Sequence, residues 1–311
     1  MQHTPTVHIL LASYNGAKYL PQQLASIAQQ THYRWTLTVS DDGSTDDTRH
    51  IIQRFAQSVN QSVTLLNGPK AGSSTLNFFH LIQHIKTNNS RDLYAFCDQD
   101  DVWLPHKLDR AVHWHLHNSN EAVRLYCART QLVNEQLKPI GLSSGIQRPP
   151  SFGNALVQNI ASGNTMVMSE AVIMAEKKIL PQHSVWHDWT TYLAATAVGG
   201  RVWFDDEPCL LYRQHDANVI GANNGLVAQF NRLKPLLEGR FKLWTDTNLS
   251  AVCDLNGLLT QENLILHQQF NQLRSTPAAL NRLRIWKKTV IRRQRFVSNF
   301  TLGIGLLLSL I

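Results

Sequence analysis

The stretch Leu93-Tyr94-Ala95-Phe96-Cys97-Asp98-Gln99-Asp100-Asp101 joins an apolar run to three closely spaced carboxylates. The five apolar residues predict a buried strand. Side chains alternate along an extended chain, so Asp98 and Asp100 would point to the same side. Their oxygens suit Mg²⁺ or Mn²⁺, especially where phosphates supply further ligands. The alternative interpretation is a solvated acidic turn before a helix.

Strand and helix patterns alternate on both sides of this stretch. The expected strands are Val7–Ala12, Trp35–Ser40, Val63–Leu66, Leu93–Cys97 and Val123–Thr130. The expected helices are Ala17–Gln30, Thr45–Gln57, Thr75–Lys86 and Pro105–His117. This alternation predicts βαβ units, and therefore an α/β fold with a mostly parallel central sheet.

The remainder of the chain is less regular. We expect a loop over Leu137–Pro150, which is rich in Gly, Ser and Pro. Further expected strands are Asn164–Met168, Arg201–Phe204 and Leu210–Gln214, with a helix at Trp189–Ala197. From about Gly225 the pattern is helical. We therefore expect an α/β domain over residues 1–222 and a helical region over residues 223–311.

The cysteines and the N-terminal segment bear on the compartment. The four cysteines are scattered and form no Cys-x-x-Cys pair. This pattern argues against a zinc site or a disulfide framework and fits a reducing compartment. The first residues are polar and lead directly into a strand, so we expect no signal peptide.

Two further turns follow the first two expected strands. They are Ala12-Ser13-Tyr14-Asn15-Gly16 and Asp41-Asp42-Gly43-Ser44. Carboxyl ends of parallel strands meet at one edge of a sheet, where open α/β sheets bind ligands. A carboxylate there can accept hydrogen bonds from a nucleobase or ribose, and Gly43 permits a positive φ. Each turn taken alone could also be a plain connection.

The joint order of these motifs resembles glycosyltransferase family 2. Its elements are the two turns and the segment Phe96-Cys97-Asp98-Gln99-Asp100-Asp101-Val102-Trp103-Leu104-Pro105. The acidic segment, followed by Lys107-Leu108, is most similar to rhamnosyltransferase-type members. The resemblance covers roughly residues 6–220. It implies a GT-A fold, a nucleotide-sugar donor, a divalent metal and inversion at the anomeric carbon.

The resemblance also implies which residues bind the donor. The nucleotide-sugar pocket would take residues from both turns and from the acidic segment: Ala12, Ser13, Tyr14, Asp41, Asp42 and Asp98. Asp98 and Asp100 would hold Mg²⁺ or Mn²⁺ on the diphosphate. A metal ion there would neutralise the charge that grows on the departing nucleoside diphosphate.

An inverting transfer needs a base that takes the proton from the acceptor hydroxyl. The segment Trp186-His187-Asp188-Trp189 is similar to the place where the family has an acidic pair at the start of a helix. The resemblance implies Asp188 as this base. His187 stands where the family often has glutamate, and its role is left open. The alternative for Asp188 is an N-cap of the helix Trp189–Ala197.

Two later segments also resemble the family. In Tyr212-Arg213-Gln214-His215, the resemblance implies that Arg213 meets the pyrophosphate and that His215 is a third metal ligand. An ordinary strand end with a solvated histidine is the alternative. Ser162-Gly163-Asn164-Thr165 resembles the segment that approaches the donor sugar or the acceptor, which assigns Asn164 to the nucleotide-sugar site. The alternative is a tight turn into a strand.

The positive charge of the chain is concentrated near its C-terminus. The net charge is +7, and no acidic residue follows Glu262. Eight basic residues follow instead: Arg274, Arg282, Arg284, Lys287, Lys288, Arg292, Arg293 and Arg295. Without them the net charge would be −1, so the basicity belongs to a tail.

The basic tail leads into the apolar segment Phe296–Ile311. As a helix this segment would be about 24 Å long, which is shorter than the ~30 Å hydrocarbon core of a bilayer. A basic helix with an apolar end is typical of attachment to an anionic membrane surface, rather than of nucleic-acid binding. We expect location at the cytoplasmic face of the plasma membrane. The alternative is a helix packed on the protein or on a second subunit.

Taken together, these observations predict an inverting, metal-dependent glycosyltransferase. The resemblance favours dTDP-L-rhamnose as the donor, with UDP-hexoses next. Membrane attachment would favour a lipid-linked saccharide acceptor in bacterial cell-surface polysaccharide synthesis, of the O-antigen or capsule type. One alternative is a haloacid-dehalogenase-type phosphohydrolase, although its Asp-x-Asp normally opens the fold and three strands come first here. The other alternative is a nucleotide-sugar-binding protein without catalysis.

Overall fold

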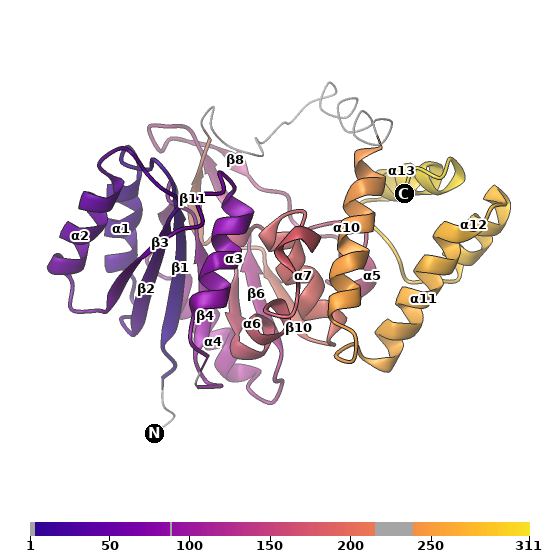
Figure 1. Ribbon diagram of the computed structural model, residues 1–311, viewed down its shortest axis with the longest axis horizontal. Helices are drawn as coiled ribbons and strands as arrows, with labels where there is room; N and C mark the ends of the chain where they lie inside the picture. The colour runs from indigo at the N-terminus through magenta and orange to yellow at the C-terminus, as the bar shows by residue number, and fades with distance from the viewer. Residues whose placement is uncertain (1–3, 88, 215–238) are drawn as a thin grey trace.

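The computed structural model describes residues 4–87, 89–214 and 239–311 (Figure 1). Its centre is a seven-stranded sheet in the order β10-β6-β9-β4-β1-β2-β3. The strands are β1 (Val7–Ser13), β2 (Trp35–Asp41), β3 (Val63–Asn67), β4 (Leu93–Cys97), β6 (Arg124–Ala128), β9 (Val167–Ser169) and β10 (Arg201–Asp205). Strand β9 runs antiparallel to β4 and β6, and the other pairs are parallel. The expected mostly parallel α/β sheet is confirmed.

Helices cover both faces of this sheet. They are α1 (Leu20–Ala28), α2 (Thr48–Ser58), α3 (Ser74–His84), α4 (Lys107–His117), α6 (Glu170–Glu176) and α7 (His187–Ala197). Alternation along β1 decides which side chain meets which layer. Ile9 and Leu11 belong to a cluster with residues of α1, α2 and α4. Leu10 and Ala12 belong to a second cluster with residues of α3, α6 and α7.

A second, smaller sheet lies beside the carboxyl end of β4. Its order is β5-β11-β7-β8, with β5 (Val102–Trp103), β11 (Leu210–Arg213), β7 (Gln131–Val133) and β8 (Pro139–Leu142). Strand β8 lies within Leu137–Pro150, so the expectation of a loop there was wrong for four residues. Their main-chain groups pair with β7, which a Gly- and Pro-rich sequence does not predict.

The segment around residue 164 also differs from expectation. Residues Gly163–Thr165 form a single 3-10 turn, η1, and the strand begins only at Val167. The Thr165 hydroxyl and amide N–H both donate to the Ser162 carbonyl, at 2.8 and 2.9 Å. This closure turns the chain before β9, so Asn164 lies in a turn rather than in a strand. Short segments that sequence analysis did not predict are α5 (Phe152–Ala155), α6 and the 3-10 turn η2 (Pro181–His183).

The described part of the C-terminal region is mainly helical, as expected. It contains α10 (Arg240–Asp254), α11 (Gln261–Ser275), α12 (Ala279–Lys287) and α13 (Phe296–Leu307). Figure 1 shows α10 beside α7, with α11 to α13 further out. Val252, Phe270 and Leu302 of these helices belong to the same apolar cluster as Leu10 and Phe96 of the sheet. The two regions therefore share one core, and the expected boundary at residues 222 and 223 lies outside the described residues.

The basic tail is only partly exposed. Arg282 and Arg293 are buried. The Arg282 guanidinium donates to four main-chain carbonyls, including Leu306 at 2.6 Å and Leu307 at 2.7 Å, and so caps the C-terminal end of α13. These two basic residues of the tail therefore face the protein interior rather than solvent. No helix of the described part of the chain is long and apolar enough to cross a membrane.

Candidate active site

The two predicted turns form one joined edge at the carboxyl ends of β1 and β2. The Asn15 side-chain oxygen accepts a hydrogen bond from the Thr45 N–H at 2.8 Å. The Ser44 hydroxyl accepts one from the Asn15 N–H at 2.9 Å, and the Asp42 N–H donates to the Ser13 carbonyl at 2.9 Å. Asn15 and Gly43 both have positive φ, 46° and 91°. The turns therefore hold each other in place before any ligand binds.

Gln99, the one amide in the acidic segment, fixes the first turn from the other side. Its side-chain oxygen accepts from the Tyr14 N–H at 2.9 Å, and its NH₂ group donates to the Tyr14 carbonyl at 3.0 Å. A Cβ at Gly16 would overlap this amide. Sequence analysis gave Gln99 no role. Its residue type could have indicated this role, because a side-chain amide has both the acceptor and the donor needed to bond the N–H and the carbonyl of one residue.

The two carboxylates of the second turn bind the chain itself. Asp41 is buried and accepts from Ser44, at 2.5 Å, and from the Arg49 guanidinium, at 3.0 Å. Asp42 is also buried and accepts from the N–H groups of Ala71 and Gly72 at 3.1 and 2.8 Å. Both residues therefore order the loops around the predicted pocket. Their contact with base or ribose stays a prediction.

The side chains of the first turn differ in accessibility. Ala12 and Ser13 are buried, whereas Tyr14 is 52% exposed. The Ser13 hydroxyl faces the Asp41 carboxylate at 3.4 Å. Among the residues predicted to line the nucleotide pocket in these two turns, Tyr14 offers the largest free surface for stacking a base.

Carboxylates from distant parts of the sequence converge beyond β4. Burial, together with the nearby charges of Asp100 and Asp188, raises the pKa of Asp98 to about 8. Burial and the charges of Asp100 and Asp98 also raise the pKa of Asp101 well above its usual range. Asp101 accepts a hydrogen bond from the Asn164 amide. The fold thus brings the acidic segment, the η1 turn and α7 together at one place.

Asp188 lies in the first turn of α7, and Trp186 occupies the N-cap position. The alternative of an Asp188 N-cap is therefore wrong. Hydrogen bonds from the Trp189 N–H, the Asn159 side chain and the Gly163 N–H lower the pKa of Asp188, but burial outweighs them and the pKa is raised to about 6. The Trp189 bond is 2.6 Å long. A carboxyl group with such a pKa can accept a proton near neutral pH.

His187 is a packing residue. Its ring stacks on Phe78 with 3.9 Å between centroids and meets the edge of Phe96 at 5.2 Å. A Cβ at Gly163 would overlap its Nε2 atom. Burial lowers the pKa of His187 to about 3, so the ring is neutral at physiological pH. The open question from the sequence is thereby answered: His187 wedges the start of α7 against η1 and the sheet.

Arg213 lies beneath the acidic segment. Its buried guanidinium donates to the carbonyls of Asp100, at 3.0 Å, and Glu135, and to the Gln22 side chain. It also stacks 4.6 Å from the centre of the Tyr19 ring. Arg213 therefore positions the main chain at Asp100. To contact the pyrophosphate as predicted, its guanidinium would have to give up some of these hydrogen bonds and donate to the pyrophosphate instead. His215, the predicted third metal ligand, lies outside the described residues.

Lys107 is a further charged residue behind the cluster. It is 1% exposed, and its ammonium group lies 4.3 Å from the centre of the Trp103 ring. Burial lowers its pKa, whereas the charges of Cys209, Cys97, Asp101 and Asp98 raise it. Sequence analysis noted Lys107 only as part of a motif, because its burial arises from tertiary packing.

The donor atoms at this edge fit a hard divalent cation. In the segments that the structure describes, no three His, Cys, Asp or Glu side chains form a metal-binding group. Mg²⁺ and Mn²⁺ are commonly held by one or two carboxylates together with substrate phosphates and water. Burial and the neighbouring carboxylates raise the pKa of Asp98, and a bound cation would favour the charged form against both effects. Asp98 and Asp100 therefore remain a fitting pair.

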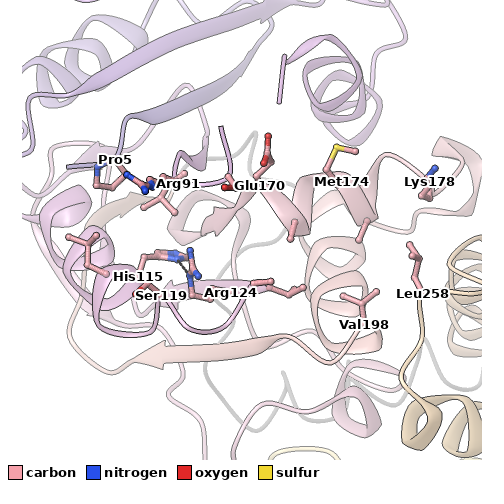
Figure 2. Close-up of a pocket in the computed structure, with 17 residues that line it drawn as sticks. Pro5, Arg91, His115, Ser119, Arg124, Glu170, Met174, Lys178, Val198 and Leu258 are labelled. Carbon is pink, nitrogen blue, oxygen red and sulfur yellow. Dashed lines mark hydrogen bonds between the residues drawn. The ribbon is translucent and has the colours of Figure 1, made fainter. Parts of the chain in front are cut away.

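A cavity of about 1190 Å³ lies at the opposite edge of the sheet (Figure 2). It is lined by residues at the amino ends of β1, β4 and β6, among them Pro5, Arg91 and Arg124. Glu170 and Met174 of α6 form another wall. None of the predicted site residues lines this cavity, which separates it from the acidic edge.

Comparison with known proteins defines the class. Residues 8–180 match the family Glycosyl transferase family 2. The chain is 29% identical over 236 residues to dTDP-rhamnosyl transferase RfbG of Shigella flexneri, covering 72% of this chain and 78% of that protein. It is also 30% identical over 115 residues to the Escherichia coli enzyme WfgD, named UDP-Glc:alpha-D-GlcNAc-diphosphoundecaprenol beta-1,3-glucosyltransferase. That match covers 36% of this chain and 42% of WfgD.

Solved structures show the same fold. S. aureus TarS 1-349 in complex with UDP-GlcNAc has a TM-score of 0.54 at 14% identity, with 97% of this chain and 81% of that chain covered. Mannosyltransferase PcManGT from Pyrobaculum calidifontis, in complex with GDP-Man and Mn²⁺, gives 0.51 at 13% identity, covering 99% and 86%.

The fold is therefore a GT-A-like α/β fold. The chain belongs to glycosyltransferase family 2, and its relatives include rhamnosyl and glucosyl transferases. It is accordingly a glycosyltransferase rather than a phosphohydrolase or a non-catalytic binding protein.

Proposed function

We propose that this enzyme transfers a sugar, with inversion, from a nucleotide-sugar donor to a hydroxyl group of a saccharide. The observation that carries the proposal is the convergence of Asp98, Asp100 and Asp188 at the carboxyl edge of the sheet. The RfbG relative supports dTDP-L-rhamnose as the donor, and the WfgD relative supports UDP-glucose as the second choice.

The reaction follows from this arrangement. Asp188 accepts the proton of the acceptor hydroxyl while the oxygen of that hydroxyl forms a bond to the anomeric carbon. The bond from that carbon to the diphosphate oxygen breaks, and the nucleoside diphosphate leaves with the electron pair. Mg²⁺ or Mn²⁺ held by Asp98 and Asp100 would supply charge stabilisation to the diphosphate. Tyr14 offers its exposed ring to the base, and Arg213 keeps Asp100 in position through its carbonyl.

A panel of nucleotide sugars tests the donor. Thermal unfolding would be followed with dTDP-L-rhamnose, UDP-glucose, UDP-GlcNAc and GDP-mannose, each with Mn²⁺, Mg²⁺ or EDTA. A ligand that binds the native state raises the midpoint. We expect dTDP-L-rhamnose with a divalent ion to give the largest rise. A larger rise with a UDP-hexose would assign that sugar as the donor in place of dTDP-L-rhamnose. No rise with any donor would contradict the proposal.

We further propose a lipid-linked saccharide acceptor in cell-surface polysaccharide synthesis, with the enzyme attached to the cytoplasmic face of the plasma membrane. Support comes from α13, on which Phe296 is 82% exposed and Phe300 67% exposed. Lys287, Lys288 and Arg295 are exposed nearby in the sequence. Apolar side chains flanked by cations match the surface of an anionic bilayer.

Sedimentation with vesicles tests the attachment. The double variant Lys288→Gln/Arg295→Gln should weaken binding to phosphatidylglycerol vesicles by about 1 kcal/mol per charge, and high salt should do the same. Arg54→Gln is the matched control, because Arg54 is exposed on α2, at the other end of the molecule (Figure 1). If the unmodified protein does not bind these vesicles at low salt, the membrane assignment fails.

A further inference from the structure

An aromatic cluster begins two residues before Asp188. The ring centroids of Trp186 and Trp189 are 5.8 Å apart, and those of Trp186 and Trp244 are 5.0 Å apart. Phe241 adds an edge contact to Trp244 at 5.2 Å. Trp189 is buried and donates its indole N–H to the Ala155 carbonyl at 2.7 Å. Trp186, Phe241 and Trp244 are only partly buried.

Three consecutive residues at the start of α7 point in different directions. His187 packs against Phe78 and Phe96. Asp188 receives hydrogen bonds from the Asn159–Gly163 side and acts electrostatically on Asp98. Trp186 turns toward Trp244 of α10. The Trp186 and Trp244 rings are therefore close in sequence or space to the proposed base Asp188, but they are not part of the packing of His187 on Phe78 and Phe96.

The aromatic cluster also lies away from the expected nucleotide. The turns assigned to the nucleotide follow β1 and β2, whereas α7 and α10 stand side by side on the other side of β4 (Figure 1). An incoming acceptor must approach the anomeric carbon opposite the departing diphosphate in an inverting transfer. The surface beside α7 and α10 is consequently the side from which the acceptor is expected.

We propose that Trp186 and Trp244 form a subsite for a pyranose ring of the acceptor saccharide. This inference rests on the proposed transfer reaction. An indole face carries negative charge density, and it attracts the positively polarised C–H groups on one face of a pyranose. The hydroxyl groups at the rim of the sugar stay free for hydrogen bonding. Stacking would thus hold the ring while one hydroxyl is presented to Asp188.

The C-terminal tail stabilises this surface. The Arg293 guanidinium lies 4.3 Å from the centre of the Phe241 ring, and its Nε–H donates to the Val157 carbonyl at 3.1 Å. Arg293 therefore ties the first turn of α10 to the segment that precedes η1. The helical region thereby contributes to acceptor binding, in addition to any attachment to membranes.

Trp244→Leu tests the subsite. Wild type and variant would be compared for transfer to methyl pyranosides of glucose, N-acetylglucosamine and rhamnose, for donor hydrolysis by water, and for pyranoside binding by saturation-transfer NMR with nucleoside diphosphate present. We expect KM for the acceptor to rise about ten-fold, while donor binding and hydrolysis stay within two-fold. Trp244→Phe should restore most of the affinity, because it keeps an aromatic face.

Trp203→Leu is the matched control, since Trp203 is 49% exposed on β10 and belongs to no aromatic cluster described above. Absence of pyranoside binding to the wild type, or an unchanged acceptor KM in Trp244→Leu, would overturn the subsite. If Trp244→Leu and Trp244→Phe both lost donor binding and transfer to the same extent, the subsite would also be overturned, because the aromatic cluster would then serve the stability of the fold rather than acceptor binding. Failure of the wild type to bind or hydrolyse any nucleotide sugar would instead contradict the proposed reaction, and the NMR experiment would still decide the subsite.

Discussion

Two groups of charged residues in this enzyme differ in the partners that the fold provides for them. At the carboxyl edge of the sheet, Asp98, Asp101 and Asp188 are crowded together, and each has a raised pKa. In the C-terminal region, the Arg282 guanidinium is surrounded by four carbonyl oxygens. Arg293 is likewise held by a carbonyl and an aromatic ring.

The difference separates a ligand site from a structural site. Main-chain carbonyls accept hydrogen bonds from both arginines, although burial still lowers the pKa of Arg293 to about 10. Among the described residues, the charge of Lys107 lowers the pKa of Asp98, whereas Asp100 raises the pKa of both Asp98 and Asp101. Buried charges without full compensation are costly and cluster at functional sites. Charge that the fold leaves uncompensated is charge that a metal ion or a proton can compensate.

The largest expected effect is loss of the proposed metal pair. Asp100→Ala should lower transfer by about 10³-fold or more, because charge on the diphosphate is then not neutralised. The thermal midpoint should not fall, since one repulsive carboxylate is removed. Assays with and without EDTA, and Mn²⁺ titration of both proteins, measure this. Asp109→Ala, at an exposed site on α4, should behave as wild type. Full activity of Asp100→Ala would refute the metal assignment.

Asp188→Asn should lower turnover by about 10²-fold, because the amide cannot take the acceptor proton. Donor affinity should stay nearly unchanged. In the wild type, burial holds the pKa of Asp188 at about 6, so turnover should increase as pH rises through that value. The variant should lose this limb of the pH profile. Weak donor binding with normal turnover would reassign Asp188 to a structural role.

Arg282→Met should reduce the free energy of unfolding by about 3–5 kcal/mol, because the buried Leu306 carbonyl and three partly buried carbonyls lose their donor. Arg284→Met is the control, since Arg284 is exposed on the same helix. Chemical denaturation of both variants gives the difference. Equal stability of the two variants would show that buried arginine charge is dispensable here.

Glu176 adds a third case, a buried carboxyl group that accepts a hydrogen bond from the Thr191 hydroxyl at 2.8 Å. Burial raises its pKa to about 8. The folded state therefore binds a proton that the unfolded state releases near pH 4.5. The resulting stability is complete below pH 4.5 and is lost as pH rises to 8.

Glu176→Gln should remove this loss. The free energy of unfolding of the variant, relative to that of the wild type, should therefore increase by roughly 1–3 kcal/mol between pH 5 and 8. Denaturation curves across that range measure the difference. A constant difference between the two proteins would show that Glu176 does not change its protonation on unfolding.

Much of the fold could be predicted from local sequence patterns. The strands β1 to β4 and the helices that follow them appear within a few residues of expectation, because their apolar periodicity is continuous. Predictions were less accurate where short elements pair over long distances. Strand β8 was expected as a loop, and Asn164 was expected in a strand rather than in η1.

The candidate site shows the same division. Repeated polar turns at strand ends were visible in the sequence, and so was the acidic segment. The roles of Gln99, Lys107 and His187 were not visible, because each depends on a neighbour far away in the chain. Arg213 and Arg293 have the same formal charge as solvated arginines, and only their burial reveals that they bind carbonyl oxygens.

The sequence by itself determined the alternation of strands and helices, the carboxylates at the end of β4 and the concentration of positive charge near the C-terminus. These features depend on residue type and spacing alone. Tertiary structure decided that Asp188 meets Asp98, that the helical region shares the core of the sheet, and that Trp186 meets Trp244. Such contacts depend on burial and on long-range packing, which determine the solvation and the partners of every charge.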